Sequence, residues 1–505
     1  MAVMIGRKSL LIVISKTISA LLGYVGFFLI TRYLPKTFFG EISYTMSLVA
    51  LFFAFSDLGF ATSHIKRISE GKDPDDCLSS YLVIKVLLVV GVVSAIFLSL
   101  WVWTGLMDRP LNDTSFQLVA LFTLYFVFYN VAQIATATFD AHMKTAKTQI
   151  SLISEMVIRL PLILFFAIPQ ENVFALAWAY VLGGLAVAVV AIFLLFREGL
   201  RLKRPTLMRS MAIFAMPLAF IVVLGVAIGN IDKVTLGFFW NSEEVATYAA
   251  GQTVLNMLFV FGAALSTLLF PTFSRLHEDG DKESMKLMVR RGERYLSYIV
   301  TPIVCVFLIF PTLIAMVLAG PDYLSSAAVM QVLCLNVLIL SLGSVYSTQI
   351  VALNRAKELV WLTVLQLGLL LLFLVLFVPS SFFQVPMLDL KAVGTAYAVL
   401  LSTLIVVVLY RIMVWRMIGL GFNRAMSFHL IAAFLSIGTL LAIQMVYSPT
   451  RWYDILLIWA ASAGVFYLAL YLMREMREND IRYFLEVLSP VEMGRYLRSE
   501  FRKKP

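Results

Sequence analysis

The chain has 505 residues, of which 61% are apolar and 14% are charged, and its formal net charge is +10. Soluble domains contain roughly 45–50% apolar and about 25% charged residues, so this composition excludes a soluble globular protein. The three cysteines form no CxxC pair and the four histidines are scattered. The sequence therefore predicts neither a disulfide framework nor a metal site.

Fourteen apolar segments follow one another along the chain. Most of them reach the roughly 20 residues that a helix needs to cross a bilayer. Backbone polar groups cannot stay unpaired in lipid, so we predict an all-α polytopic membrane protein with about 14 transmembrane helices. The segments lie at about 9–33, 39–62, 78–107, 116–139, 149–169, 173–196, 211–239, 245–270, 295–319, 325–352, 359–379, 392–414, 427–447 and 454–473.

The basic residues are distributed very unevenly among the joints between these segments. Of the forty Lys and Arg residues, 31 lie in the N-terminus, the even-numbered joints and the tail, and five lie on the other side. Because cytoplasmic loops carry the excess of Lys and Arg, we predict that both termini are cytoplasmic and that the protein resides in the cell membrane. This topology accounts for the net charge, and no nucleic-acid partner is expected.

A weak internal repeat predicts the domain organisation. The turns at 33–40 and 239–245 each combine an aromatic helix end, a short polar turn and a new apolar run. We expect two parallel six-helix lobes, 1–196 and 211–414, as in transporters with a substrate cavity between the halves. A basic cytoplasmic linker, 197–210, would join the lobes. Two extra helices (415–473) would follow, then a basic amphipathic cytoplasmic tail (474–505) lying on the membrane lipids of the inner leaflet.

Ionisable residues inside the predicted spans are the candidate site residues. Each costs about 2.5–3.5 kcal/mol at the centre of a membrane helix, so we expect them to face protein or water. The last seven segments are expected to contain none. The seven residues are Lys16, Asp57, Lys85, Glu155, Arg159, Asp232 and Lys233.

Spacing suggests how some of these charges are arranged. Glu155 and Arg159 are four residues apart, share a helix face and can pair. Asp232 and Lys233 are adjacent, about 100° apart around the helix, and are not expected to face one groove together. For Lys16 and Lys85, snorkelling to the cytoplasmic interface is the simpler interpretation.

For Asp57, near the inner end of its segment, the simpler interpretation is a helix cap or a local ion pair. Taken together, the four cations and three acids predict a polar interior with a slight cationic excess. The chain contains no G-x-S-x-G, no Gly-rich phosphate loop and no paired-Asp motif in a cytoplasmic domain, and its outer loops are short. We therefore expect no enzyme, no catalytic residue, no metal and no cofactor.

Four stretches carry a resemblance to a known family. The stretches are Arg32-Tyr33-Leu34-Pro35 with Phe39-Gly40, Asp57-Leu58-Gly59 and Arg67-Ile68-Ser69; 230–237 (NIDKVTLG) with Val245 and Tyr248; 320–327 (GPDYLSSA); and 353–357 (LNRAK) with Val378-Pro379 and 393–396. In the order and spacing of these stretches, the sequence resembles the polysaccharide flippases of the multidrug/oligosaccharidyl-lipid/polysaccharide exporter superfamily over nearly its whole length. It departs slightly at 394–396, where Gly-Thr-Ala replaces the Gly-Ala-Ala of many relatives.

The resemblance implies two six-helix lobes plus two helices, working by alternating access. It also implies that the protein moves a polyprenyl-(pyro)phosphate-linked oligosaccharide from the inner to the outer leaflet, with H⁺ or Na⁺ as a coupling ion and glycan-assembly proteins as possible partners. On this hypothesis Arg159, with Lys16, Lys85 or Lys233, meets the phosphate. Asp57, Glu155 or Asp232 takes the coupling ion.

Three alternatives stay open at this point. A cation-coupled multidrug antiporter of the same superfamily would have a net acidic, aromatic cavity. A lipid II flippase shares the layout of fourteen helices, but its cavity is typically richer in cations. A membrane sugar polymerase or ligase is the least favoured, because it would need larger outer loops.

Overall fold

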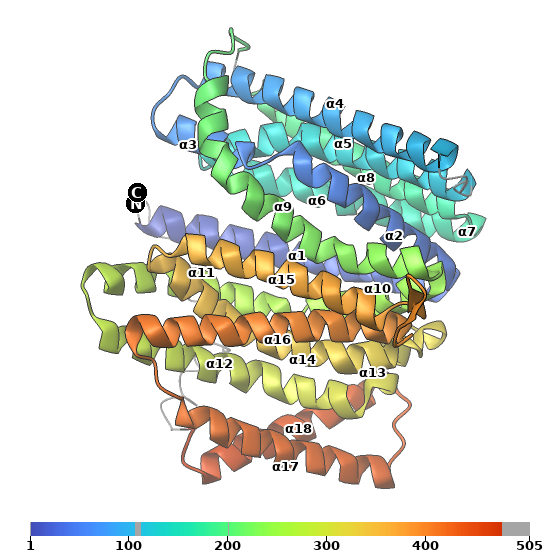
Figure 1. Cartoon of the computed structure of the whole chain (residues 1–505), viewed down its shortest axis with the longest axis vertical. Helices are drawn as coiled ribbons and strands as arrows, with labels where there is room; N and C mark the ends of the chain where they lie inside the picture. Colours follow the sequence, from blue (N-terminus) through green and yellow to red (C-terminus); the bar gives the residue numbers. More distant parts are fainter. Residues whose placement is uncertain (1, 107–112, 200, 477–505) are drawn as a thin grey trace. The chain divides into compact units, whose positions relative to one another are not determined.

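The computed structural model describes residues 2–106, 113–199 and 201–476, and nearly all of them are helical (Figure 1). The chain forms two compact units, residues 1–246 and 247–505. The helices up to the end of the first unit are α1 (Ala2–Tyr33), α2 (Lys36–Phe53), η1 (Ala54–Ser56), α3 (Phe60–Ser69), α4 (Pro74–Leu106), α5 (Asp113–Ala141), α6 (Thr145–Leu162), the π-helical turn η2 (Ile163–Ala167), α7 (Ile168–Gln170), α8 (Val173–Phe196) and α9 (Met208–Phe239).

Helix α10 begins in the first unit and continues into the second, which contains the remaining elements. They are α10 (Ser242–Asn256), α11 (Phe259–Glu278), α12 (Lys282–Ile309), α13 (Pro311–Leu318), η3 (Pro321–Tyr323), α14 (Ser326–Ala352), α15 (Ala356–Phe377), β1 (Ser381–Phe382), β2 (Val385–Pro386), α16 (Lys391–Ile418), α17 (Arg424–Val446) and α18 (Trp452–Leu472). The two short strands form an antiparallel hairpin in the connection between α15 and α16, with Ser381 opposite Pro386.

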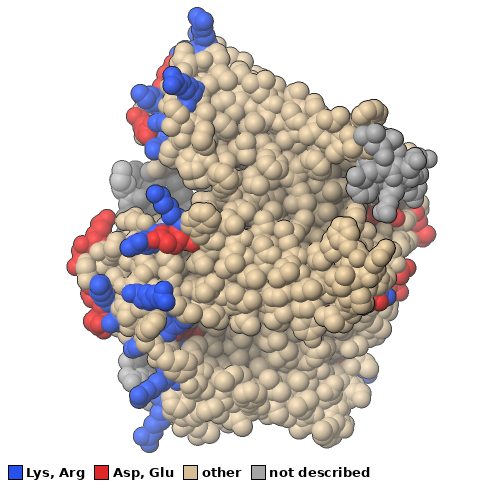
Figure 2. Space-filling model, in the orientation of Figure 1, with Lys and Arg blue, Asp and Glu red and all other residues tan. Residues whose placement is uncertain are grey.

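Twelve of the described helices are long and apolar enough to cross a membrane. Figure 2 shows that in each unit the displayed Lys and Arg side chains gather at helix ends, next to a broad surface without charged residues. Such an apolar band between charged rims matches the hydrocarbon core of a bilayer. The predicted class, an all-α polytopic membrane protein, is confirmed, whereas the count of 14 spans and the cytoplasmic termini stay predictions.

Three of the predicted segments are interrupted in the structure. Segment 39–62 breaks after η1, where Leu58 and Gly59 have φ angles of 47° and 83°. Segment 295–319 breaks between Phe310 and Pro311, since a residue that precedes proline is disfavoured in the helical conformation. Segment 245–270 divides into α10 and α11 at residues 257–258.

The core of the first unit forms around α8, which packs against α5 and α6. Alanines and glycines make up much of its buried surface, and such small side chains let neighbouring membrane helices approach closely. In the second unit, α14 packs against α11, α12 and α16, and α17 and α18 pack against each other and against α12.

The predicted linker, 197–210, lies within the first compact unit. Its backbone N–H groups at Arg201, Lys203 and Thr206 donate hydrogen bonds to side chains in the first turns of α4. The Lys203 ammonium also lies 2.7 Å from the Asp73 carboxylate, and hydrogen bonds to Asp73 and Asp75 raise the pKa of Lys203. These contacts fix the linker against the start of α4.

Helix α9, predicted as the first helix of the second lobe, packs against α2 and α3. The compact units therefore divide after Ala246 rather than at the linker. The two-lobe repeat itself stays a prediction. The predicted tail lies outside the described residues beyond position 476.

Glycine permits the close approach of α2 to the start of α10. A Cβ atom added at Gly40 would lie 1.8 Å from the Ser242 carbonyl oxygen, and backbone of this kind cannot move aside as a flexible side chain can. We expect Gly40→Ala to destabilise the protein by about 1–3 kcal/mol, the usual cost of overpacking. The measurement is the apparent melting temperature in detergent, followed by intrinsic fluorescence.

Gly91→Ala is the matched control for this prediction. Gly91 lies in α4, where an added Cβ would meet no atom within 4 Å. Alanine is about 0.5–1 kcal/mol more favourable than glycine inside a helix, so this variant is expected to melt at or slightly above the wild-type temperature. Equal melting of Gly40→Ala and wild type would contradict the close α2–α10 contact.

Candidate functional site

Asp57 and Lys85 form a buried ion pair at the break that follows α2. The Lys85 ammonium lies 3.3 Å from Asp57 Oδ1 and donates a 2.6 Å hydrogen bond to Gln133 Oε1 on α5. Asp57 Oδ1 also accepts a hydrogen bond from the Ala61 backbone N–H, which caps α3, and one from the Tyr81 hydroxyl. Lys85 is only 1% exposed, so its predicted snorkelling is wrong, because an acid and an amide within the bundle hold its charge.

Glu155 and Arg159 form the pair that their spacing predicts. Arg159 donates a 2.7 Å hydrogen bond to Glu155 Oε1, which also accepts one from the Tyr125 hydroxyl on α5. The guanidinium carbon lies 4.4 Å from the centre of the Tyr180 ring on α8, within cation–π range. A Cβ atom at Gly183 would approach the Glu155 and Arg159 side chains to 3.2 and 3.3 Å, so a glycine on α8 leaves room for the pair.

Asp232 and Lys233 on α9 also contact each other. The Lys233 ammonium lies 3.2 Å from Asp232 Oδ1 and donates a 3.1 Å hydrogen bond to the Gly229 carbonyl. Both side chains are largely buried. The expectation that the two side chains face different neighbours is wrong, because the long lysine side chain bends back across the angle that separates them.

The six candidate residues whose side chains are described therefore form three ion pairs, all within the first unit. The side chain of Lys16 lies outside the described residues. Helix α5 contacts two of the pairs, through Tyr125 and Gln133, which lie eight residues or about 12 Å apart along one helix. The three described cations are thus each balanced by a neighbouring carboxylate, and the cationic excess expected from the sequence, which depends on Lys16, stays a prediction.

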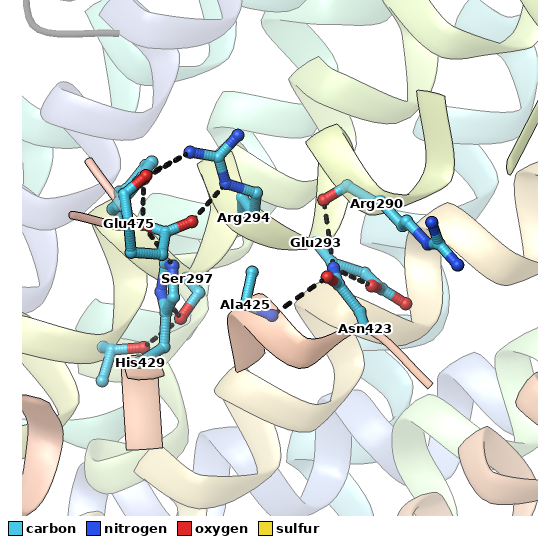
Figure 3. Close-up of polar contacts among 10 residues, drawn as sticks. Arg290, Glu293, Arg294, Ser297, Asn423, Ala425, His429 and Glu475 are labelled. Carbon is cyan, nitrogen blue, oxygen red and sulfur yellow. Dashed lines mark hydrogen bonds and ion pairs between the residues drawn. The ribbon is translucent and has the colours of Figure 1, made fainter. Parts of the chain in front are cut away.

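A second group of buried charges lies in the second unit, where the sequence predicts none. Glu293 on α12 accepts a 2.6 Å hydrogen bond from the Tyr346 hydroxyl and a 2.7 Å one from the Asn423 amide. Arg411 Nε on α16 lies 3.7 Å from the same carboxylate. Figure 3 shows Asn423, just before α17, beside Glu293. The expectation of charge-free later segments is wrong, because Arg411 lies inside segment 392–414, where Glu293 from just outside segment 295–319 balances its charge.

A neighbouring cluster joins α12 to α17 and to the residues after α18. The Glu475 carboxylate accepts hydrogen bonds from Arg294 and Tyr298, and His429 Nε2 lies 3.4 Å from it (Figure 3). Burial raises the pKa of Glu475, but the nearby His429, the hydrogen bond from Tyr298 and the charge of Arg294 outweigh it and lower the pKa overall. His429 Nδ1 lies 2.9 Å from the Ser297 hydroxyl.

The sequence carries a signal for these clusters that hydropathy alone does not reveal. Glu293, Ser297 and Thr301 recur every four residues, as do Arg294 and Tyr298, so they mark polar stripes along α12. Because Glu293 and Arg294 adjoin a run of basic residues, the charge pattern by itself indicates a cytoplasmic loop there. Their burial depends on α14, α16 and α17, which pack against α12.

The bundle of long apolar helices with paired charges inside it defines a polytopic membrane protein. Solved structures share this fold. The fold is similar to lipid II flippase MurJ in an inward closed conformation (TM-score 0.75, 13% identity, 92% of this chain and 99% of that chain). It is also similar to an inward-facing multidrug resistance MATE transporter (TM-score 0.58, 12% identity, 79% and 94%).

The chain belongs to the polysaccharide biosynthesis protein family, whose model matches residues 5–277. This confirms the resemblance to polysaccharide flippases, and the family and fold are those of transporters rather than enzymes. The chain is 21% identical over 411 residues to the probable low-salt glycan biosynthesis flippase Agl15 of Haloferax volcanii, covering 80% of this chain and 82% of that protein. It is 32% identical over 119 residues to the uncharacterized membrane protein MJ1068 of Methanocaldococcus jannaschii, a match to 23% of this chain and 24% of that protein.

Proposed function

We propose that this protein moves a polyprenyl-(pyro)phosphate-linked oligosaccharide from the inner to the outer leaflet by alternating access, for surface polysaccharide or glycoprotein assembly. The family and the similarity to a glycan biosynthesis flippase support the substrate class. The Glu155–Arg159 pair carries the proposal at the level of residues, since it holds an arginine within a membrane bundle through a carboxylate of the same helix.

The physical task explains why such an arginine is needed. Phosphate and sugar hydroxyls cannot enter hydrocarbon unaided, because each polar group loses its hydrogen bonds to water. Guanidinium binds phosphate through two parallel hydrogen bonds, in the same geometry as it binds carboxylate. The phosphate of the carrier lipid can therefore replace Glu155 as the partner of Arg159, and Glu155 returns when the substrate leaves.

The same exchange offers a route for coupling to an ion gradient. A proton or Na⁺ that neutralises Glu155 weakens its attraction for Arg159 and makes the guanidinium available to phosphate. Asp57 and Asp232 stand in the same relation to Lys85 and Lys233. On this proposal these three acids accept the coupling ion, and the paired cations, together with Lys16, bind the substrate.

The test is translocation in proteoliposomes that contain a fluorescent polyprenyl-phosphate oligosaccharide, followed by its accessibility to an external lectin. Arg159→Ala is expected to slow translocation about ten- to hundredfold, because a hydrogen bond to a charged group contributes about 1.5–3 kcal/mol. The double variant Glu155→Gln/Arg159→Gln leaves no charge unpaired, so it is expected to fold normally and still fail to translocate.

Arg355→Ala is the matched control, since Arg355 is largely exposed and pairs with Glu358 in the second unit. Full activity of Arg159→Ala at normal abundance would contradict the phosphate role of Arg159. Wild-type protein that exposes no glycolipid but exports a hydrophobic cation when a pH or sodium gradient is applied would favour the multidrug antiporter.

A further inference from the structure

A polar hollow of 220 Å³ opens at one end of the first unit, apart from the three ion pairs. It lies among the start of α2, the start of α5, the end of α9 and the start of α10. In the predicted orientation this end of the helices faces outward. The side chains that define its chemistry are Glu41, Tyr44, Thr114, Ser115, Trp240 and Asn241.

The walls of this hollow are held in place by close contacts. Asn241 Oδ1 accepts a 3.1 Å hydrogen bond from the Glu244 backbone N–H and so caps α10. The Tyr44 ring lies directly against Gly237, where an added Cβ would come within 2.2 Å of it. A site with side chains fixed in this way loses little conformational entropy when a ligand binds.

The lining combines one aromatic indole, one carboxylate, an amide and several hydroxyls. Hydroxyl groups both donate and accept hydrogen bonds, an amide does the same with separate atoms, and a carboxylate accepts from two donors at once. Trp240 adds a flat apolar surface with a polar edge. A sugar ring presents the matching surfaces, namely hydroxyls around its edge and C–H groups on its faces.

The charge and the volume of the hollow further restrict the class of ligand that it can bind. Among the described residues that line the hollow, Glu41 alone carries a charge, and its negative sign disfavours a phosphate group. A metal ion is poorly supported, because the described residues include no group of three or more His, Cys, Asp or Glu side chains that could hold one. The volume falls below the roughly 300–1,000 Å³ typical of sites for drug-sized ligands, so one ring fits better than a whole oligosaccharide.

We propose that this hollow is a subsite for a single neutral sugar ring of the transported glycan. The inference rests on the proposed function, and it divides recognition between two places in the first unit. The buried cations bind the phosphate of the carrier, and the hollow binds one sugar unit. The residues of the hollow would then favour lipids that carry a glycan over the bare carrier.

Direct binding tests the subsite independently of transport. The probes are methyl glucoside, methyl mannoside, methyl galactoside and N-acetylglucosamine, measured by saturation-transfer-difference NMR with the full chain in nanodiscs. At least one of these sugars is expected to bind saturably in the millimolar range, with methyl glucuronide binding more weakly than methyl glucoside because of Glu41. Trp240→Ala and Glu41→Gln are each expected to weaken binding about tenfold or more, the effect of one lost interaction with a charged or aromatic group.

Matched controls are Trp361→Ala, an exposed tryptophan of α15, and Glu243→Gln, a neighbouring acid outside the lining. Both are expected to bind sugar like the wild type. The subsite would be overturned if none of the sugars bound saturably, or if Trp240→Ala and Glu41→Gln bound them as tightly as the controls. Competition by millimolar inorganic phosphate would also overturn it, because the hollow would then be an anion site.

Translocation separates this inference from the proposed function. Glu41→Gln is expected to slow the oligosaccharide-bearing lipid about tenfold and to leave translocation of polyprenyl phosphate without sugar unchanged, whereas Arg159→Ala slows both. If the wild type moves neither lipid but binds sugar through Trp240, the subsite stands and the flippase function fails. If the glycolipid moves equally fast in Glu41→Gln and wild type, the subsite fails and the flippase function stands.

Discussion

Replacing Asp57 with alanine while Lys85 remains is expected to destabilise the protein by about 3–5 kcal/mol, the usual cost of leaving a buried charge without its partner. Lys85 is 1% exposed, and its ammonium contacts Asp57 and Gln133 inside the first unit. The substitution also removes the acceptor that caps α3 through the Ala61 N–H. The measurement is the apparent melting temperature in detergent, compared with the wild type.

The double variant Asp57→Asn/Lys85→Met is expected to recover most of this loss, because no charge remains unpaired and asparagine can still cap α3. Glu70→Ala serves as the control, since Glu70 forms exposed pairs with Lys66 and Arg67 that are expected to contribute below about 1 kcal/mol. If Asp57→Ala melts at the same temperature as the wild type, the buried pair does not exist as described. A stable double variant that no longer translocates would assign the pair to transport rather than to folding.

Replacing Glu293 with alanine is expected to destabilise the second unit by a similar amount, about 3–5 kcal/mol. The Glu293 side chain is 2% exposed and accepts hydrogen bonds from Tyr346 and Asn423, with Arg411 3.7 Å away. Removing the carboxylate leaves the Arg411 charge, the Tyr346 hydroxyl and the Asn423 amide without this partner. Each group left unsatisfied adds its own desolvation cost. The expected readout is a fluorescence melting transition at a lower temperature than that of the wild type.

Glu283→Ala is the matched control for Glu293→Ala. Both residues lie on α12, but Glu283 is 82% exposed, and exposed pairs such as the one it forms with Lys286 contribute little. The melting temperature of Glu293→Gln is expected to lie between those of Glu293→Ala and Glu283→Ala, because glutamine keeps one acceptor oxygen but no charge. Equal melting of Glu293→Ala and Glu283→Ala would show that the Glu293 network does not stabilise the second unit.

Hydropathy is sufficient for the class of fold, because a helix that crosses the hydrocarbon core must be predominantly apolar. Long apolar stretches such as 173–196 and 359–379 correspond closely to α8 and α15. Helix breaks within such stretches are harder to predict from hydropathy. Pro311 gives a local signal for the end of α12, whereas the break at Leu58-Gly59 depends on backbone conformations that hydropathy does not report.

The sequence by itself determined the all-α membrane architecture, the family and the Glu155–Arg159 pair, since each follows from composition, motif order or spacing along one helix. Only the tertiary structure decided that Lys85 meets Asp57 and Gln133, that Glu293 meets Tyr346, Arg411 and Asn423, and that Glu41 and Trp240 share one hollow. These residues come from different helices or from the turns beside them, and the partners are far apart in the chain. The physical reason is that helical periodicity fixes which residues share a face, but the packing of one helix on another fixes which faces meet.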